Sequence, residues 1–537
     1  MDKFDKIISE MTIDELIGQL ICYCVPSKDD DETKQKFEEK VKRTKPGAIF
    51  FNTSSMEKIK SYIELTNRNL KIPVIVAGDT EYGPNTIADC ETQLPYPIAW
   101  GSADDDTLIE RGGRETAKIC RKSGLHWSFA PVVDIWYNKD CAESTRIISD
   151  SAEHVARIGS AYVRGHQKDG IFAACAKHFP GAGTDDRNPH FCNPENRLTK
   201  EEWDKTYGMV YKKMIDDGVL SIMTGHYTFP AYQSKAEYDE VYGYRPATLS
   251  YELTTKLLRE ELGYDGLIAS DALSMVGAAA YVPLNRLTIE TIKAGSDMAL
   301  FPPNSAFDDL KGAVESGEIS IERIKESVKR VLKLKDKVSL LDATEPETEL
   351  GDIRSVAQEI ADKSIKVVRN AEGILPLSAK KGETFFVINH YCIWDDNPKY
   401  GCISDIEEML QKRGFKTVSR TNPDNVEVKK VVDEYKPDYI LVNARHSYLD
   451  TYGNSRHVLW KNIMAFWRGT IFEGNKVIFT SFGDPFMLYE LPFLKTYVNA
   501  FSPTKESKEA FLKVLFGEME AKGKNPVELK PFFEREV

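Results

Sequence analysis

Short apolar segments alternate with longer amphipathic segments through residues 17–301 of this chain of 537 residues. This alternation is typical of repeated βα units, in which a buried strand is followed by a helix with one apolar face. Eight parallel strands joined by helices predict a closed (β/α)₈ barrel. We predict the strands near residues 17–25, 48–51, 73–78, 126–133, 172–177, 221–225, 267–270 and 298–301.

Helix start and stop signals lie between these strands. Thr199 is followed by Glu202, and Ser250 by Glu252, which is typical of capped helix starts. Several predicted helices end at a glycine, as at Gly124, Gly170, Gly218, Gly263 and Gly295. We predict helices at residues 104–123, 152–169, 199–217, 251–262 and 285–294.

A second strand and helix pattern follows a basic amphipathic helix predicted at residues 321–337. Residues 341–352 begin with an acidic, proline-containing stretch that lacks an apolar period, which indicates an exposed linker. We therefore predict a catalytic (β/α)₈ barrel domain at residues 1–340, this linker, and a doubly wound, Rossmann-like α/β sandwich domain at 353–537. Its strands are predicted near 366–368, 384–388, 439–443, 476–481 and 496–501, and its helices near 404–413 and 505–516.

The charge balance argues against polyanionic partners. Lys and Arg number 71 against 83 Asp and Glu, a net charge of −12, so we expect no nucleic-acid or membrane partner. The first 15 residues are charged throughout, unlike a signal peptide. The nine cysteines are scattered, which favours buried thiols in a reducing cytoplasm over a disulfide framework, and we expect no metal site.

Ionisable residues follow five of the predicted barrel strands at their carboxyl ends. In a parallel barrel these ends share one rim, where catalytic groups are found. A single Asp after a strand commonly caps the next helix, but capping alone hardly explains all five positions. The residues are Asp79, Asp134, Lys177 with His178, His226 and Asp271.

Three of these side chains, together with Arg146, favour chemistry on a sugar. Asp271 at the end of a buried strand is suited to covalent attack on an electrophilic carbon, although it could instead cap the following helix. Asp79 could accept hydrogen bonds from vicinal hydroxyls, while Arg146 and Lys177 could donate to others. The glycine-rich loops of phosphate and dinucleotide sites are missing from the sequence, so we expect no cofactor.

The loop at residues 177–190 carries the densest set of functional groups. It reads Lys-His-Phe-Pro-Gly-Ala-Gly-Thr-Asp-Asp-Arg-Asn-Pro-His, and its Gly and Pro content is typical of a loop on a rigid scaffold. Taken alone, His190 could equally be a structural histidine. The segment resembles the Lys-His-Phe-Pro-Gly-His-Gly…Asp-Ser-His motif of glycoside hydrolase family 3, in its NagZ-type β-N-acetylhexosaminidase branch.

Other segments match the same family in the same order. Residues 267–277 are similar to its nucleophile segment, and 129–134 and 222–226 to further barrel segments. The resemblance covers roughly residues 10–340, and it continues more weakly at 370–377 and 514–526, as in the two-domain members.

The resemblance implies a retaining mechanism that cleaves terminal sugars. Asp271 would form a covalent glycosyl intermediate, and His190, assisted by Asn188, would act as the acid and base. The expected function is an exo-acting β-N-acetylhexosaminidase, cytoplasmic and monomeric or homodimeric, whose partner is a small carbohydrate substrate. The substrate-binding residues carried over are Asp79, Arg146, Lys177 and His178, together with His226 and Met275 in the matching segments.

Three positions depart from the family motif. Asn188 and Pro189 replace the Asp-Ser that precedes the histidine, and Ala182 replaces a second histidine. An Asn can orient an imidazole but cannot stabilise its positive charge, so we expect a less basic His190 unless Asp185 or Asp186 folds in.

Three functions therefore stay open. A β-glycoside phosphorylase of the same fold is the first alternative, because an imidazole acid and base repels phosphate less than a carboxylate does. A sugar-binding paralogue that has lost efficient catalysis is the second, since a fold can outlive its activity. We expect a structural role for the second domain, with His446 and His457 incidental.

Overall fold

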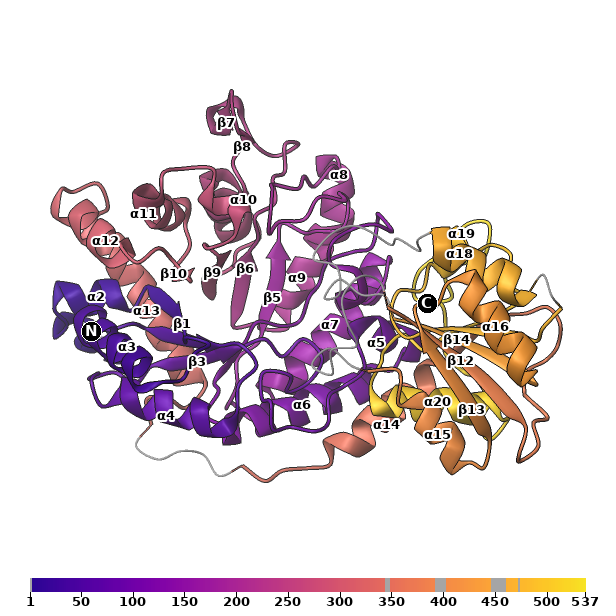
Figure 1. The fold of residues 1–537 in the computed structure, drawn as a ribbon. Helices are drawn as coiled ribbons and strands as arrows, with labels where there is room; N and C mark the ends of the chain where they lie inside the picture. The colour runs from indigo at the N-terminus through magenta and orange to yellow at the C-terminus, as the bar shows by residue number, and fades with distance from the viewer. Residues whose placement is uncertain (1, 343–347, 392–401, 446–459, 472–473) are drawn as a thin grey trace. The chain divides into compact units, whose positions relative to one another are not determined.

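The computed structural model describes the whole chain except residues 1, 343–347, 392–401, 446–459 and 472–473 (Figure 1). The chain forms two compact units, which we describe separately. The first contains Met1–Gln93, Ile109–Ile135 and Val155–Ile353, and the second contains Leu94–Leu108, Trp136–His154 and Arg354–Val537. His446, His457, Cys392 and residues 343–347 of the predicted linker lie outside the described residues.

The first unit contains an eight-stranded parallel sheet in the order β4-β3-β2-β1-β10-β9-β6-β5. Parallel bridges from Trp127 to Ala173 and from Val132 to Lys177 join its two end strands, which confirms the predicted barrel. The strands are β1 (Ile21–Cys24), β2 (Ala48–Phe51), β3 (Ile75–Gly78), β4 (Trp127–Ser128), β5 (Cys175–Phe179), β6 (Ser221–Thr224), β9 (Leu267–Ala272) and β10 (Met298–Leu300).

Helices surround these strands (Figure 1). They are α1 (Lys3–Ser9), α2 (Ile13–Gly18), α3 (Asp31–Thr44), α4 (Met56–Asn67), α6 (Asp106–Lys122), α7 (Ala152–Gln167), α8 (Lys200–Trp203), α9 (Met209–Asp216), α10 (Val276–Ala279), α11 (Leu284–Ala294), α12 (Ala306–Glu315) and α13 (Ile321–Lys337). Shorter elements are η2 (Asp204–Gly208), η3 (Lys235–Glu237), η4 (Ala247–Leu249), η5 (Glu252–Glu261) and the hairpin β7 (Tyr238–Asp239) and β8 (Gly243–Tyr244), labelled at the top of Figure 1.

The first predicted strand began too early. Residues 13–18 form α2, because Thr12 and Glu15 make a reciprocal capping box that starts a helix there. The strand begins only at Ile21. At Thr199 the predicted capping box is present.

Apolar side chains fill the inside of the barrel. Phe50, Trp127, Phe129 and Met223 belong to one buried cluster, and the indole N–H of Trp127 donates to Ser221 Oγ at 2.7 Å. A second cluster packs the outer strand faces against the surrounding helices. Burial on both faces explains why these strands are continuous apolar runs in the sequence.

The second unit contains a six-stranded sheet in the order β11-β16-β15-β14-β12-β13, in which the described strands pair in parallel except for the antiparallel pair β11 and β16. This is the doubly wound topology predicted. The strands are β11 (Lys366–Asn370), β12 (Thr384–Tyr391), β13 (Lys416–Thr421), β14 (Tyr439–Arg445), β15 (Val477–Ser481) and β16 (Thr496–Asn499).

Helices lie on both faces of this sheet. One face packs with α14, α15 and α20 through a buried cluster, and α16 packs on β12. The helical segments are α5 (Pro97–Ala103), η1 (Ser144–Arg146), α14 (Ile353–Ser364), α15 (Ile406–Lys412), α16 (Asn425–Tyr435), α18 (Trp460–Phe466), η7 (Trp467–Ile471), α19 (Met487–Glu490) and α20 (Lys505–Leu515).

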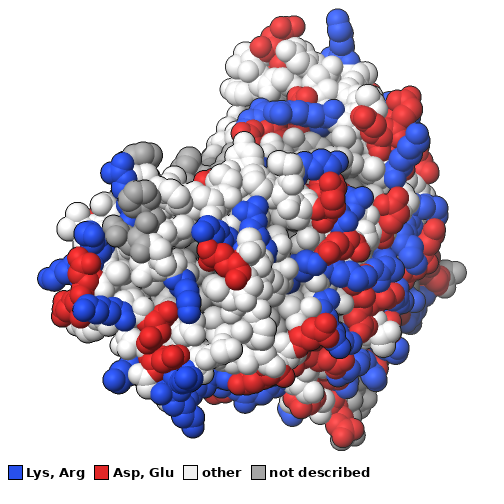
Figure 2. Space-filling view, turned by 90° about the vertical axis from the view of Figure 1, so that its right-hand side faces the viewer, with Lys and Arg blue, Asp and Glu red and all other residues white. Residues whose placement is uncertain are grey.

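The surface carries both signs of charge. Figure 2 shows Lys and Arg side chains interspersed with Asp and Glu over the face drawn. Among the described residues, helices long and apolar enough to cross a membrane are absent. The eight cysteines that the structure describes are all free thiols.

Candidate active site

The predicted rim residues lie where parallel strands end. Asp79 directly follows β3, His226 follows β6 by two residues, and Asp271 is the next-to-last residue of β9. Lys177 and His178 lie inside β5 rather than beyond it, because this strand runs two residues further than predicted. The carboxyl ends of these strands form one edge of the barrel.

Asp271 is held as a carboxylate by its surroundings. Burial alone would raise its pKa, but nearby His226 and His178, the backbone N–H of Ala272 and Lys177 together lower the pKa below its ordinary value. The Ala272 N–H donates to Asp271 Oδ1 at 2.7 Å. Asp271 is therefore ionised near neutral pH, as a nucleophile must be.

Lys177 bridges two carboxylates. Its Nζ lies 3.1 Å from Asp79 Oδ1 and 2.6 Å from Glu81 Oε1. The side chains of Lys177 and Glu81 are 5% and 9% exposed, whereas Asp79 is 43% exposed. Glu81 therefore anchors the buried ammonium, and Asp79 keeps a solvent-facing carboxylate that can accept hydrogen bonds from a ligand.

Glu81 was not among the predicted site residues. Its sequence signal is its place two residues after Asp79 in the same loop. The pairing with Lys177 joins segments almost a hundred residues apart, so spacing alone could not identify it.

His178 is fixed by Asp134, the ionisable residue that follows β4. His178 Nδ1 donates to Asp134 Oδ2 at 2.8 Å, and the backbone N–H of Ala182 donates to Oδ1 at 2.7 Å. Asp134 is fully buried, so one carboxylate orients the imidazole and ties down the start of the following loop.

His226 is also oriented by protein groups. Its Nε2 lies 2.9 Å from the carbonyl of Ala272, and its Nδ1 lies 2.9 Å from Thr248 Oγ1. Burial lowers the pKa of His226 although the nearby Asp271 carboxylate opposes this shift, and Nε2 donates to the Ala272 carbonyl, which can only accept. Both nitrogens are thus engaged beside Asp271, and Thr248 is a second contributor that sequence reasoning missed.

His190 lies beside Asn188, as the motif predicts. Its Nδ1 is 2.8 Å from Asn188 Oδ1, which also accepts the backbone N–H of His190 at 3.0 Å. Since an amide oxygen can only accept, Nδ1 carries the proton in this arrangement. Proton transfer by His190 is therefore left to Nε2.

Neither neighbouring aspartate replaces the carboxylate absent at position 188. Asp185 is buried and accepts from Arg187 Nε at 2.9 Å and from the Glu195 N–H at 3.0 Å. Burial would raise its pKa, but these donors hold the pKa well below the usual range. Asp186 is exposed. Asn188 Oδ1 contacts the His190 ring at 2.8 Å.

The loop of His190 is docked onto the segment that follows Asp271. The backbone N–H of Val276 donates to the His190 carbonyl at 3.2 Å. A Cβ at Gly277 would lie 2.6 Å from the Pro189 carbonyl oxygen and 2.8 Å from that of Cys192, so only glycine admits the loop there. The partly buried Met275 precedes this contact as the N-cap of α10.

The remaining predicted residue, Arg146, lies in η1, which belongs to the second unit. Among the described residues, clusters of three or more His, Cys, Asp or Glu side chains suited to a metal ion are absent.

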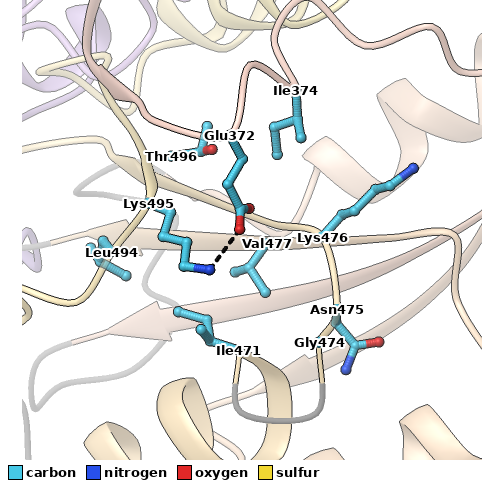
Figure 3. A pocket seen from close by; sticks show the side chains of 10 residues that line it. All are labelled: Glu372, Ile374, Ile471, Gly474, Asn475, Lys476, Val477, Leu494, Lys495 and Thr496. Atoms are coloured by element: carbon cyan, nitrogen blue, oxygen red, sulfur yellow. Dashed lines mark hydrogen bonds and ion pairs between the residues drawn. The ribbon is translucent and has the colours of Figure 1, made fainter.

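A pocket of about 410 Å³ lies in the second unit (Figure 3). It is lined by the beginnings of β15 and β16, whereas ligands of doubly wound sheets bind at the carboxyl ends of strands. Its Glu372 and Lys495 pair with each other at 2.7 Å. This pocket contains none of the predicted site residues.

Known proteins match the chain over nearly its whole length. The family model described as "Glycosyl hydrolase family 3 N terminal domain" matches residues 12–334. A relative from Cellulomonas fimi named "Beta-N-acetylglucosaminidase/beta-glucosidase" is 27% identical over 97% of this chain and 94% of its own. The solved structure titled "Beta-glucoside phosphorylase BglX bound to 2FGlc" is 26% identical, with a TM-score of 0.86 over 98% of this chain and 97% of that chain. A β-N-acetylglucosaminidase structure from Paenibacillus sp. str. FPU-7 is 25% identical, with a TM-score of 0.81 over 98% and 100%.

Proposed function

The chain belongs to glycosyl hydrolase family 3, and on that premise we propose that it is a retaining, exo-acting β-N-acetylhexosaminidase. Asp271 is the proposed nucleophile and His190 the proposed acid and base. The observation that carries the proposal is the docking of the His190 loop onto Val276, five residues after Asp271. A carboxylate and a proton-transferring imidazole are thereby held on joined segments of one rim.

The first step of the proposed reaction forms a glycosyl ester. A carboxylate oxygen of Asp271 attacks the anomeric carbon while His190 Nε2 donates its proton to the departing glycosidic oxygen. The low pKa of Asp271 keeps it ionised, and the Ala272 N–H orients Oδ1. The leaving group departs as an alcohol.

The second step releases the sugar. His190 Nε2, now without its proton, removes a proton from water as the water oxygen attacks the anomeric carbon and the bond to Asp271 breaks. Two inversions at one carbon give net retention. Asn188 keeps Nδ1 protonated throughout, so the same nitrogen of His190 serves both steps.

The other predicted residues divide into sugar-binding and positioning groups. Asp79, Lys177 and His178 are proposed to bind hydroxyls, and Arg146 and Met275 stay proposed substrate contacts. We assign His226 to positioning, since it donates to the Ala272 carbonyl directly after Asp271.

Phosphorolysis is a second candidate, favoured by the chemistry of the acid and base. The ring of His190 is bonded to a neutral amide instead of a carboxylate, so an incoming phosphate dianion meets less repulsion there. A similar solved structure is titled a β-glucoside phosphorylase. In this reaction phosphate replaces water in the second step, and the product is a sugar 1-phosphate.

One panel of substrates tests these assignments. Nitrophenyl β-glycosides that differ only in the sugar are assayed with and without inorganic phosphate. We expect N-acetylglucosaminide to be cleaved fastest and reducing sugar to be released without phosphate. A glucoside preference would overturn the proposed substrate, and sugar 1-phosphate formed at a higher rate would establish the second candidate. Inactivity toward all substrates would favour a binding paralogue.

A further inference from the structure

An exposed apolar side chain directly follows the proposed acid and base. Phe191 is 58% exposed although it lies in a turn fixed by backbone hydrogen bonds, in which the N–H groups of Phe191 and Cys192 both donate to the Asn188 carbonyl. The ring centroids of Phe191 and His190 are 6.3 Å apart. One exposed apolar side chain is ordinary on a protein surface, so the meaning of Phe191 depends on what lies beside it.

A second exposed apolar side chain lies on the other segment of the same contact. Val276 is 47% exposed, and its backbone N–H is the group that donates to His190 at 3.2 Å. Phe191 and Val276 therefore flank the His190 backbone from two different loops. We call this pair the apolar lip.

The charged side chains near the lip balance one another and give no surplus of positive charge for an anionic ligand. Arg187 and Arg197 both pair with Asp185, at 2.5 and 3.2 Å, so this one carboxylate compensates only one of the two positive charges. The exposed Asp186 adds negative charge to this loop. A neutral ring fits such a surface better than a carboxylate or a phosphate does.

We propose that the apolar lip binds a neutral second sugar ring, the one that leaves when the glycosidic bond is cut. This rests on the proposed function, because His190 must reach the leaving oxygen and the leaving group therefore lies next to Phe191 and Val276. Aromatic and branched aliphatic side chains pack against the apolar face of a ring and are typical of ligand sites.

The test compares leaving groups on one donor sugar. Chitobiose and methyl β-N-acetylglucosaminide are assayed, or cellobiose and methyl β-glucoside if the panel above selects glucose. In Phe191→Ala we expect the ratio of kcat/KM for disaccharide over methyl glycoside to fall about tenfold. Phe191→Tyr should restore the ratio, and Val276→Thr should lower it by a smaller factor. Tyr435→Ala, which removes a 47% exposed aromatic side chain from α16, should leave it unchanged.

Each outcome separates the lip from the proposed function. If the wild type cleaves glycosides but Phe191→Ala keeps the wild-type ratio, the lip proposal is wrong and the proposed function stands. If Tyr435→Ala lowers the ratio equally, the effect does not belong to Phe191, and the lip proposal is again overturned. A wild type that prefers a disaccharide with an acidic leaving sugar contradicts the charge argument. Inactivity of the wild type toward every glycoside overturns the proposed function itself.

Discussion

Asn188 determines how readily the His190 ring takes up a proton. Its amide oxygen accepts the Nδ1 proton at 2.8 Å and so selects Nε2 for chemistry, but it adds no negative charge. Asp185 cannot compensate, since it is buried against Arg187. The structure thus separates two effects that a carboxylate combines, orientation of the ring and stabilisation of its cation.

Asn188→Asp should restore the stabilisation of the protonated His190 ring. A carboxylate beside Nδ1 stabilises the protonated ring, so His190 stays an acid to higher pH and the basic limb of kcat/KM should move up by about one pH unit. The pH profile on an aryl glycoside measures this shift. Asp186→Asn, on the same loop but exposed, controls for a change in loop charge. An unmoved basic limb would show that His190 does not set it.

Glu81 matters because Lys177 is buried. In Glu81→Gln the ammonium loses its 2.6 Å ionic partner and depends more on Asp79 at 3.1 Å, which draws Asp79 away from a ligand. We expect kcat/KM to fall about tenfold, mainly through KM. Glu91→Gln alters an exposed acid in the same segment and should have little effect. A fall confined to kcat would contradict a role in sugar binding.

At the scale of elements, the site depends on a close approach between a loop and a helix start. Gly277 on α10 lies directly under the carbonyls of Pro189 and Cys192. The loop carries His190, and the same α10 segment follows β9 and Asp271. The close contact at Gly277 therefore fixes the position of the His190 loop relative to the segment that carries Asp271.

Gly277→Ala should displace the His190 loop relative to Asp271. The added Cβ would lie 2.6 Å from the Pro189 carbonyl oxygen, so the loop must shift, and a displacement near 1 Å can cost about a hundredfold in kcat. Gly312→Ala is the matched control, because a Cβ there meets nothing within 4 Å. Steady-state kinetics and thermal melting would be measured on both variants. Full activity in Gly277→Ala would show that the close contact between the His190 loop and α10 is not needed for activity.

The elements themselves were largely predictable, for a physical reason. Strands such as β2, buried on both faces, are continuous apolar runs. The edge strand β13 was missed because Val418 is its only buried residue. Residues 17 and 18 are predicted as strand because the end of the short helix α2 runs directly into the apolar residues of β1.

Site residues could be predicted from the sequence only where they belong to a short, recognisable motif. His190, Asn188 and Asp271 belong to segments that match a motif. Glu81, Thr248 and Gly277 act through partners distant in sequence, so their roles appear only in three dimensions.

At the scale of the whole molecule, the barrel buries a lysine far from the rim chemistry. Lys335 on α13 is fully buried, and its Nζ donates to Gln19 Oε1 at 2.7 Å. Burial lowers its pKa to about 7. An unfolded chain binds this proton up to about pH 10.4, so between pH 7 and 10 the unfolded state holds more protons than the folded state. Lys335 therefore makes the free energy of unfolding rise with pH in that window.

Lys335→Met should remove the contribution of Lys335 to the pH dependence of the free energy of unfolding. The pH dependence of the free energy of unfolding between pH 7 and 10 should be less positive than in the wild type, by up to about 1.4 kcal/mol per pH unit. Urea unfolding at several pH values measures it. Lys333→Met, at a 45% exposed side chain, should keep the wild-type slope. Equal slopes in wild type and Lys335→Met would mean that Lys335 is charged in the fold.

The most direct test of the central proposal is to trap the intermediate on Asp271. The protein is incubated with a 5-fluoro glycosyl fluoride of the accepted sugar, which slows both steps, and intact mass and peptide mapping locate the adduct. We predict one added sugar on the peptide that contains Asp271, and none in Asp271→Asn. A matched variant, Asp265→Asn, alters a 75% exposed carboxylate and should still be labelled. A sugar attached to another residue, or turnover by Asp271→Asn at the wild-type rate, would contradict the account.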